Sequence, residues 1–235
     1  MCGRYTNTAG PEELSERFKV PISHATGTRR FNIAPTEEVL AIVAGEGQAR
    51  ACALRWGLVP PWADGLRGAA RMINARIETV ATKPAYRNLI PNASRRALQI
   101  ADGYFEWLKP EQRNSPRQPF YFQLDGGVPF AFAALWTPAK IDGEWLRSVA
   151  LLTCDSRPNP VAGAIHDRMP VILADADAQR AWLDPALDAT DALALCGAPS
   201  AERLSARPAN PAVNRAGDLD AEGPGLLLAP GASIG

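Results

Sequence analysis

The sequence of 235 residues predicts a single α+β domain, in which one strongly curved, mostly antiparallel β sheet is bordered by peripheral helices. Strand-like apolar segments dominate the chain, and they do not alternate regularly with helical segments as in a parallel α/β fold. No internal repeat and no linker of different composition divides the chain. We therefore expect one domain over residues 1–222, followed by a disordered tail at 223–235, where Gly, Ala and Pro accumulate.

The N-terminal half is predicted to contain one helix and several strands. Residues 11–20 place Leu14 and Phe18 on one face, which is typical of a short amphipathic helix. Residues 31–36 are expected to form a loop, because Pro35 favours an extended conformation in the residue before it. Three further segments have the composition of strands, namely 38–44, 51–59 and 71–78.

The C-terminal half continues with strands and then turns helical. Residues 95–109 are predicted to form a strand that Asp102-Gly103 interrupts, since this pair is typical of a turn or bulge. Residues 119–136 predict a hairpin around a Gly-Gly turn, and 144–156 predict a long buried strand. The remaining expectations are a loop with at most one helical turn at 157–170, a strand at 171–174, a capped helix at 175–183, a helix at 189–196 and irregular structure from residue 199.

Composition excludes several classes of protein. The longest apolar runs, at 149–152 and 225–230, are far shorter than the roughly 20 residues of a membrane span. The N-terminus becomes acidic before any apolar stretch, so we expect no secretory signal, no membrane contact and a cytoplasmic location. The four cysteines form no CxxC pair and only two histidines are present, so we expect neither a metal nor another cofactor.

The balance of charge bears on nucleic-acid binding. The 25 basic and 25 acidic residues cancel, which argues against an unspecific, long-range nucleic-acid binder but leaves room for a local basic groove. Only four of the basic residues are lysines, and arginine suits bidentate contacts to phosphate, although genome composition produces the same bias. The cationic candidates are Arg4, Arg71, Arg76, Lys83, Arg87 and Arg168.

Cys2 directly follows the initiator methionine in the opening sequence MCGRYT. If Met1 is removed, Cys2 presents an α-amino group whose pKa near 8 leaves a useful fraction neutral at physiological pH. Such an amine can form an imine with an aldehyde, and the neighbouring thiol can close on the imine carbon to give a thiazolidine ring. Position alone does not distinguish this chemistry from an ordinary second residue.

Glu106, in the stretch DGYFEW, is a candidate for acid–base chemistry. Strand alternation places it on one face with Tyr104, opposite Phe105 and Trp107. If Phe105 and Trp107 face the core, Glu106 faces a cleft; in the reverse arrangement it is a buried carboxylate with a raised pKa. An ordinary strand glutamate fits the same pattern.

Three further candidates lie in two other motifs, and a fourth lies in a proline-rich loop. Asn74 and Arg76 in INARIET share a strand face, where an amide and a guanidinium can orient a polar substrate and hold a phosphate. His166 in IHDRMP can move a proton near neutral pH, or it is a structural residue. Trp62, which comes after two prolines, can stack on an unpaired base, although most tryptophans belong to the core.

The motifs MCGRYT, FNIAPT, RWGLVPPWA, INARIET, ADGYFEW and IHDRMPVIL occur in this order, and together they make the chain resemble the SOS-response-associated peptidase family. The resemblance runs from residue 2 to about 173 and resumes weakly at 211–214. It implies a curved, barrel-like β core with surrounding helices. It also implies an enzyme of the DNA-damage response that links its N-terminal cysteine covalently to the ring-opened aldehyde of abasic sites in single-stranded DNA.

The resemblance assigns a role to each candidate residue. Cys2 corresponds to the nucleophile, Asn74 to a ligand of the opened sugar or linkage, and Glu106 to the acid–base residue. His166 corresponds to a residue that assists proton transfer during opening of the sugar and ring closure. The expected DNA contacts are Asn32 in the pocket, Arg4, Arg76 and Arg168 on phosphates, Trp62 as a wedge beside the flipped nucleotide, and Lys83.

The resemblance also sets expectations about partners and departures. Abasic single-stranded DNA is the expected partner, with a monomeric protein that associates with the nucleoid on DNA and with proteins of the replication fork as further candidates. The sequence departs from the family in its Tyr104-Phe105 pair, where a pair of hydroxylated aromatic residues is usual. It departs again where Val213-Asn214 runs into RAGDLDAEG instead of a second asparagine.

Three alternative functions compete with this interpretation. The name of the family points to a cysteine-dependent peptidase or autopeptidase, although a methionine aminopeptidase suffices to expose Cys2. A non-covalent module for single-stranded DNA would keep the arginines without needing Cys2. Glutamine amidotransferases also begin with Met-Cys-Gly, but they are expected to carry an Asn-Gly element, and this dipeptide does not occur in the sequence.

Overall fold

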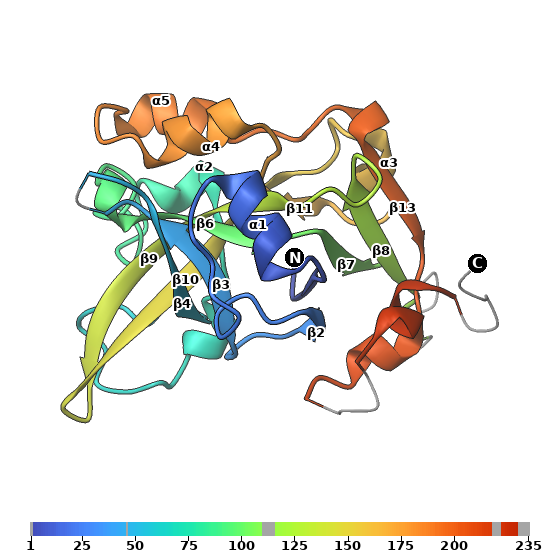
Figure 1. Ribbon diagram of the computed structural model, residues 1–235, viewed down its shortest axis with the longest axis horizontal. Helices are drawn as coiled ribbons and strands as arrows, with labels where there is room; N and C mark the ends of the chain where they lie inside the picture. Colours follow the sequence, from blue (N-terminus) through green and yellow to red (C-terminus); the bar gives the residue numbers. More distant parts are fainter. Residues whose placement is uncertain (1, 46, 110–115, 218–221, 230–235) are drawn as a thin grey trace.

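The computed structural model of the chain describes residues 2–45, 47–109, 116–217 and 222–229. Its larger sheet closes into a β barrel, which lies on the left in Figure 1. Around the barrel, β10 pairs with β4, β4 with β3, β3 with β6, and β6 with β9, and β9 pairs again with β10. Of these five pairings, only β10–β4 is parallel. The barrel strands are β3 (Glu38–Val43), β4 (Arg50–Trp56), β6 (Arg96–Ala101), β9 (Phe130–Ile141) and β10 (Glu144–Asp155).

Three short strands extend the barrel at the C-terminal half of β10 and along β9. β5 (Asn74–Arg76) runs parallel to β10, and β11 (Arg168–Pro170) runs antiparallel to it. β12 (Ile172–Leu173) pairs with β9. The motifs INARIET and IHDRMP, which are about 90 residues apart in the sequence, therefore meet on one strand.

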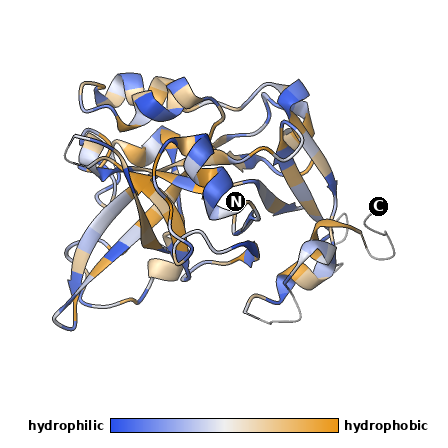
Figure 2. Ribbon diagram, in the orientation of Figure 1, coloured by the Kyte–Doolittle hydropathy of each residue, from blue (hydrophilic) through white to orange (hydrophobic). Residues whose placement is uncertain are grey.

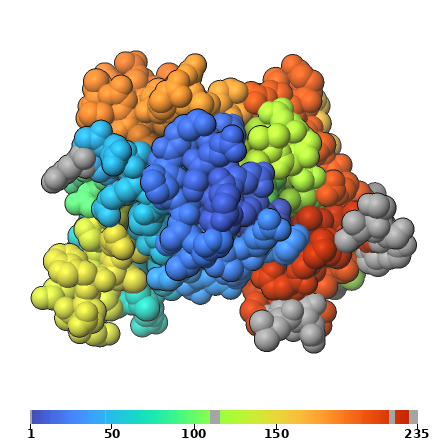
Figure 3. Space-filling view, in the orientation of Figure 1, coloured from blue at the N-terminus to red at the C-terminus, as the bar shows by residue number. Residues whose placement is uncertain are grey.

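A second, five-stranded antiparallel sheet lies beside the barrel in the order β13-β8-β7-β1-β2. Tyr5 of β1 makes edge-to-face contacts with Trp56 and Phe132 of the barrel, which joins the two sheets through one apolar core. Its strands are β1 (Arg4–Asn7), β2 (Arg30–Ile33), β7 (Gly103–Trp107), β8 (Pro119–Leu124) and β13 (Leu204–Pro208). The N-terminal segment, blue in Figure 3, consequently lies in the middle of one face of the molecule.

The helices are short and lie at the periphery, and within the described residues none is long and apolar enough to cross a bilayer. Figure 2 shows apolar residues concentrated on the strands, with hydrophilic residues on the outer helical turns. The α helices are α1 (Pro11–Phe18), α2 (Ile77–Val80), α3 (Pro160–Gly163), α4 (Ala176–Leu183) and α5 (Ala189–Ala194). The 3-10 helices are η1 (Ala69–Arg71), η2 (Ala93–Arg95), η3 (Ala201–Arg203), η4 (Pro211–Asn214) and η6 (Pro224–Leu227).

Asp102 and Gly103 mark the point where the chain leaves the barrel and enters the second sheet. Asp102 accepts hydrogen bonds from the hydroxyls of Thr6 and Thr8, the latter at 2.6 Å. Gly103 lies against the Tyr121 ring, where a Cβ atom would be 2.2 Å from the hydroxyl oxygen. The interruption predicted at this pair is thus confirmed, and it is a change of sheet.

Several of the sequence-based expectations are confirmed. The α+β class with a curved barrel and peripheral helices is observed, and strands occupy most of 38–44, 51–59 and 144–156. The three predicted helices are α1, α4 and α5. One detail of α4 differs, because Asp175 makes no capping hydrogen bond and its carboxylate instead accepts from Arg203.

Other expectations are wrong because pairing partners lie far away in the sequence. The loop expected at 31–36 is in part a strand, since its first residues belong to β2, which pairs with β1. The predicted strand 71–78 is a strand only over Asn74–Arg76, with helical turns on both sides. The predicted hairpin 119–136 is absent from the described pairings: β8 joins the second sheet, whereas β9 joins the barrel.

The C-terminal segment is more regular than expected. β13 forms within the part predicted to be irregular, because β8 offers it a free edge. Of the tail predicted to be disordered, residues 223–229 include η6, Leu226 is buried, and its carbonyl accepts from the amide of Asn210. Residues 230–235 lie outside the described residues.

The contact at Gly103 predicts a specific cost of substitution. We expect Gly103→Ala to lower the free energy of unfolding by about 2–4 kcal/mol, because the added methyl group overlaps the buried Tyr121 ring. Gly65→Ala is the matched control, since nothing lies within 4 Å of its Cβ position. Urea denaturation of both variants measures the difference, and equal midpoints would contradict the close approach.

Candidate active site

Cys2 is fully buried and lies just before β1, in the chain that retains Met1. The side-chain amide of Asn74, on β5, donates to the Cys2 carbonyl oxygen at 2.8 Å. The Cys2 thiol lies 3.6 Å from the Arg4 carbonyl oxygen, and burial, with the charge of Glu106 adding to it, raises the pKa of this thiol well above its ordinary value. The backbone of Cys2 is therefore fixed by Asn74, and its sulfur is held as a neutral thiol.

Glu106 is buried on β7, on the face that it shares with the core residue Tyr104. The opposite face is covered as well, because Phe105 packs with Tyr121 and Val213 in a separate apolar cluster. Burial, with a smaller contribution from the charge of Asp167, raises the pKa of Glu106 to about 7. The second of the two arrangements considered for this strand is therefore the observed one, and near neutral pH this carboxyl group can both donate and accept a proton.

His166 lies between α3 and β11, half-buried, next to Asp167. Its Nδ1 atom is 3.0 Å from the backbone nitrogen of Arg168, which donates to it, and 3.1 Å from a carboxylate oxygen of Asp167. Burial lowers the pKa of His166, so the neutral imidazole dominates at pH 7. Nδ1 therefore has both a hydrogen-bond donor and an acceptor within reach. The charge of Asp167 raises the pKa of both His166 and Glu106.

Contacts within the fold hold the side chain of Arg168 more firmly than expected for an arginine that is free to bind a phosphate. Its guanidinium forms an ion pair with Glu78 and donates to the Thr153 carbonyl oxygen at 2.6 Å. Only 11% of the side chain is exposed. These contacts join β11, β10 and α2 at the end of the barrel where Asn74 and Arg76 also lie.

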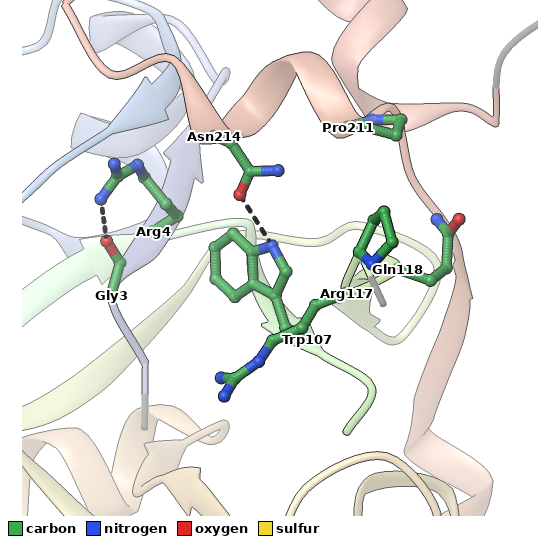
Figure 4. A pocket seen from close by; sticks show the side chains of 8 residues that line it. Gly3, Arg4, Trp107, Arg117, Gln118, Pro211 and Asn214 are labelled. Carbon is green, nitrogen blue, oxygen red and sulfur yellow. Dashed lines mark hydrogen bonds between the residues drawn. The ribbon is translucent and has the colours of Figure 1, made fainter. Parts of the chain in front are cut away.

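A pocket of about 550 Å³ opens beside Gly3 and Arg4, which come directly after Cys2 (Figure 4). Trp107 forms one wall, and its indole N–H donates to the side-chain oxygen of Asn214 at 3.0 Å. The guanidinium of Arg4 turns back and donates to the Gly3 carbonyl oxygen at 2.7 Å, whereas that of Arg117 lies on the other side of the indole. The pocket therefore places two cations and one aromatic ring next to the N-terminal cysteine.

The remaining predicted site residues differ in how deeply their side chains are buried. Asn32 is buried on β2, next to β1, whereas Arg76 is exposed at the end of β5. Lys83, in the turn after α2, is exposed, and Trp62 is 64% exposed on the loop after Pro61. In the described chain, neither Lys83 nor Trp62 has a side-chain hydrogen bond or ion pair that fixes it.

Three residues that line the pocket were not predicted as site residues from the sequence, namely Trp107, Arg117 and Asn214. Alternation along β7 placed Trp107 on the face opposite Glu106, and only the position of η4 shows that this face also borders the N-terminus. Although the sequence departs from the family pattern after Val213-Asn214, this segment packs here: Val213 is fully buried and Asn214 orients Trp107. The residues that the structure describes contain no cluster of three or more side chains suited to a metal ion.

Residues 1–216 match the family described as SOS response associated peptidase (SRAP). The match extends over most of the chain, including β13 and also η4, whose residues Pro211 and Asn214 line the pocket beside the N-terminus. The chain belongs to this family.

Two relatives and one solved structure illustrate the range of similarity. The abasic site processing protein YoaM of Bacillus subtilis is 36% identical over 188 residues, which cover 79% of this chain and 80% of the relative. The abasic site processing protein YedK of Escherichia coli is 29% identical over 229 residues, 94% of this chain and 98% of the relative. A crystal structure from Bacteroides thetaiotaomicron, 19% identical, superimposes with a TM-score of 0.79 over 96% of this chain and 98% of its own, which shows the fold.

The raised pKa of Glu106 predicts how stability depends on pH. The unfolded carboxyl loses its proton near 4.5 and the folded one near 7, so the free energy of unfolding falls as pH rises through this window. A shift of this size corresponds to about 3 kcal/mol. In Glu106→Gln we expect this slope to disappear, so the variant gains about 2–3 kcal/mol relative to wild type between pH 5 and pH 8.

Urea denaturation at both pH values measures this difference. Glu13→Gln, on the exposed face of α1, is the matched control and should behave like the wild type. Parallel pH profiles for wild type and Glu106→Gln would contradict the raised pKa.

Proposed function

We propose that this protein captures abasic sites in single-stranded DNA through a covalent bond to Cys2 after removal of Met1. The observation that carries the proposal is the arrangement of Cys2, whose backbone is held by Asn74 and whose thiol lies within the electrostatic reach of the buried Glu106. The relatives named above are abasic site processing proteins, which supports the same target for this chain. An abasic site in its open form supplies the aldehyde that an N-terminal cysteine can trap.

The reaction needs two bond-forming steps and releases one water. The α-amino group of Cys2 adds to the aldehyde carbon, and the resulting carbinolamine loses its hydroxyl group as water to give an imine. The thiol sulfur then adds to the imine carbon while the nitrogen gains a proton, which closes the thiazolidine ring. With Met1 in place the nitrogen of Cys2 is an amide, so neither step takes place.

Glu106 supplies the proton transfers in this scheme. Its pKa of about 7 keeps both protonation states populated at neutral pH. The acid form protonates the departing hydroxyl group, and the carboxylate then accepts the proton of the thiol, which is not ionised in its buried position. Asn74 holds the Cys2 backbone and presents a side-chain oxygen with no hydrogen-bond partner in the described chain, available to the opened sugar. His166, neutral at pH 7, assists opening of the sugar.

Several cationic side chains are placed to hold the DNA strand, and they differ in how firmly contacts within the fold hold them. Arg76 is exposed and therefore free to contact a phosphate, and Arg4 together with Arg117 places charge at the pocket beside Cys2. Trp62 and Lys83 are exposed at the periphery, as a wedge and a phosphate contact require. Arg168 reaches a phosphate only by leaving Glu78, so its main contribution is to fix β11 and His166. Whether the protein is monomeric on DNA and meets replication-fork proteins stays a prediction.

The decisive test uses single-stranded DNA that carries one abasic site. Purified protein lacking Met1, verified by intact mass, should give a heat-stable shifted band on a denaturing gel, and Cys2→Ala should abolish it. Cys52→Ala is the matched control, because it removes a buried thiol on β4 and should retain the band. Absence of the band in wild type would overturn the proposal.

Two substitutions separate chemistry from binding. Glu106→Gln should slow crosslink formation at pH 7 by about 10²-fold or more, the range of general acid–base catalysis, with DNA affinity nearly unchanged. Arg76→Ala should instead weaken affinity and reduce its salt dependence by about one phosphate contact. Arg29→Ala, an exposed arginine away from these elements, serves as the control. Unchanged rates and affinities in both variants would remove these assignments.

A further inference from the structure

A second pocket, of about 940 Å³, lies at the end of the barrel where β3 turns into β4. In Figure 1 this turn lies at the left of the molecule, whereas β7, whose Trp107 lines the pocket of Figure 4, lies to the right. The two pockets share no lining residue. The β3–β4 pocket therefore has no part in the chemistry assigned to Cys2.

The polar lining of the β3–β4 pocket consists mainly of donors. Arg50 and Arg95 both line it, and neither forms an ion pair within the described chain. The Arg95 guanidinium lies 5.0 Å from the centre of the Trp136 ring, and the Trp136 indole N–H has no hydrogen-bond partner there. Asp184, next to the lining residues Leu183 and Pro185, uses its carboxylate to accept the amide of Ala186. Among the described residues that line the pocket, the charged side chains are those of Arg50 and Arg95, and both are positive.

A third arginine and a second tryptophan extend this surface along the β9–β10 hairpin. Trp136 pairs with Val149, and strand alternation puts Arg147 and Trp145 on the same face. Burial raises the pKa of the Cys52 thiol, and the charges of Arg147 and Arg50 oppose this rise, so both guanidiniums lie near Cys52. Trp145 is 72% exposed, the largest exposure among the large apolar side chains of the described chain.

The apolar part of the lining is aliphatic. Ala44, Ala49, Ala93, Leu183 and Pro185 line the pocket, and Trp136 is largely buried with one face covered by Arg95. The bases of a bound nucleic-acid strand stack on exposed aromatic faces, and the residues that line the pocket offer none, because Trp145 lies outside the lining. An aliphatic floor with a rim of arginine and tryptophan is instead typical of the anchor positions of protein interfaces.

We propose that the β3–β4 pocket binds an acidic peptide segment of a partner protein, with an apolar side chain on the alanine–leucine floor and carboxylates on Arg50, Arg95 and Arg147. Guanidinium forks match carboxylates bidentately, which supplies the charge complementarity. The position of the pocket away from Cys2 lets the partner remain bound while the other side of the molecule is occupied. The protein thereby has a docking site through which it can be brought to its place of action.

The test measures binding of a fluorescein-labelled peptide of four aspartates and then three leucines, by fluorescence anisotropy with the full chain. We expect saturable binding that weakens with salt, and at least a tenfold loss of affinity in the double variant Arg50→Gln/Arg95→Gln. Arg29→Gln is the matched control and should bind like wild type. Thermal unfolding of each variant verifies that the fold is retained.

Two companion ligands decide between the possible occupants. A peptide with four asparagines in place of the aspartates should bind at least tenfold more weakly, and an unlabelled oligomer of twelve thymidylates should not displace the acidic peptide. Equal affinity for the neutral peptide, displacement by the oligonucleotide, an unaffected double variant, or no binding at 1 mM peptide would each overturn the proposal.

Discussion

The carboxylate of Asp102 holds the N-terminal strand against the place where the chain changes from the barrel to the second sheet. It accepts from Thr6 and Thr8, so β1 is fixed beside β7. Because Cys2 lies just before β1 and Glu106 lies on β7, this contact helps to bring the thiol within the electrostatic reach of the carboxyl group. Gly103 is required at the same point, since only a residue without a side chain fits against Tyr121. The candidate active site thus depends on the junction between the barrel and the second sheet at Asp102-Gly103, which lies outside the site itself.

The strand β7 is buried on both faces, and it also carries the proposed acid–base residue Glu106. One face belongs to the main core through Tyr104, and the other packs under the C-terminal segment through Phe105. Neither face leaves Glu106 in contact with bulk water, and this desolvation raises the pKa of Glu106 to about 7. The C-terminal segment therefore acts on the site in two ways: it excludes water behind β7, and it orients Trp107 at the pocket.

The sequence was informative where structure depends on local pattern. The long apolar strand β10, the helices α1, α4 and α5, and the break at Asp102-Gly103 result from alternation, periodicity and turn residues, which depend on neighbours in the chain. It failed at β2, at the supposed hairpin 119–136 and at β13, because each of these strands is defined by a partner far away in the sequence. The ordered motifs were sufficient to place the chain in its family.

The sequence by itself determined which chemical groups are present: an N-terminal cysteine behind one methionine, a strand glutamate, an amide, a histidine and a surplus of arginine over lysine. Only the tertiary structure decided what each group can do. It gave Glu106 its raised pKa through burial, tied Arg168 to Glu78, and brought Arg117 and Asn214 to the pocket beside Gly3. The physical reason is that desolvation and charge pairing depend on neighbours in space, which a linear pattern does not specify.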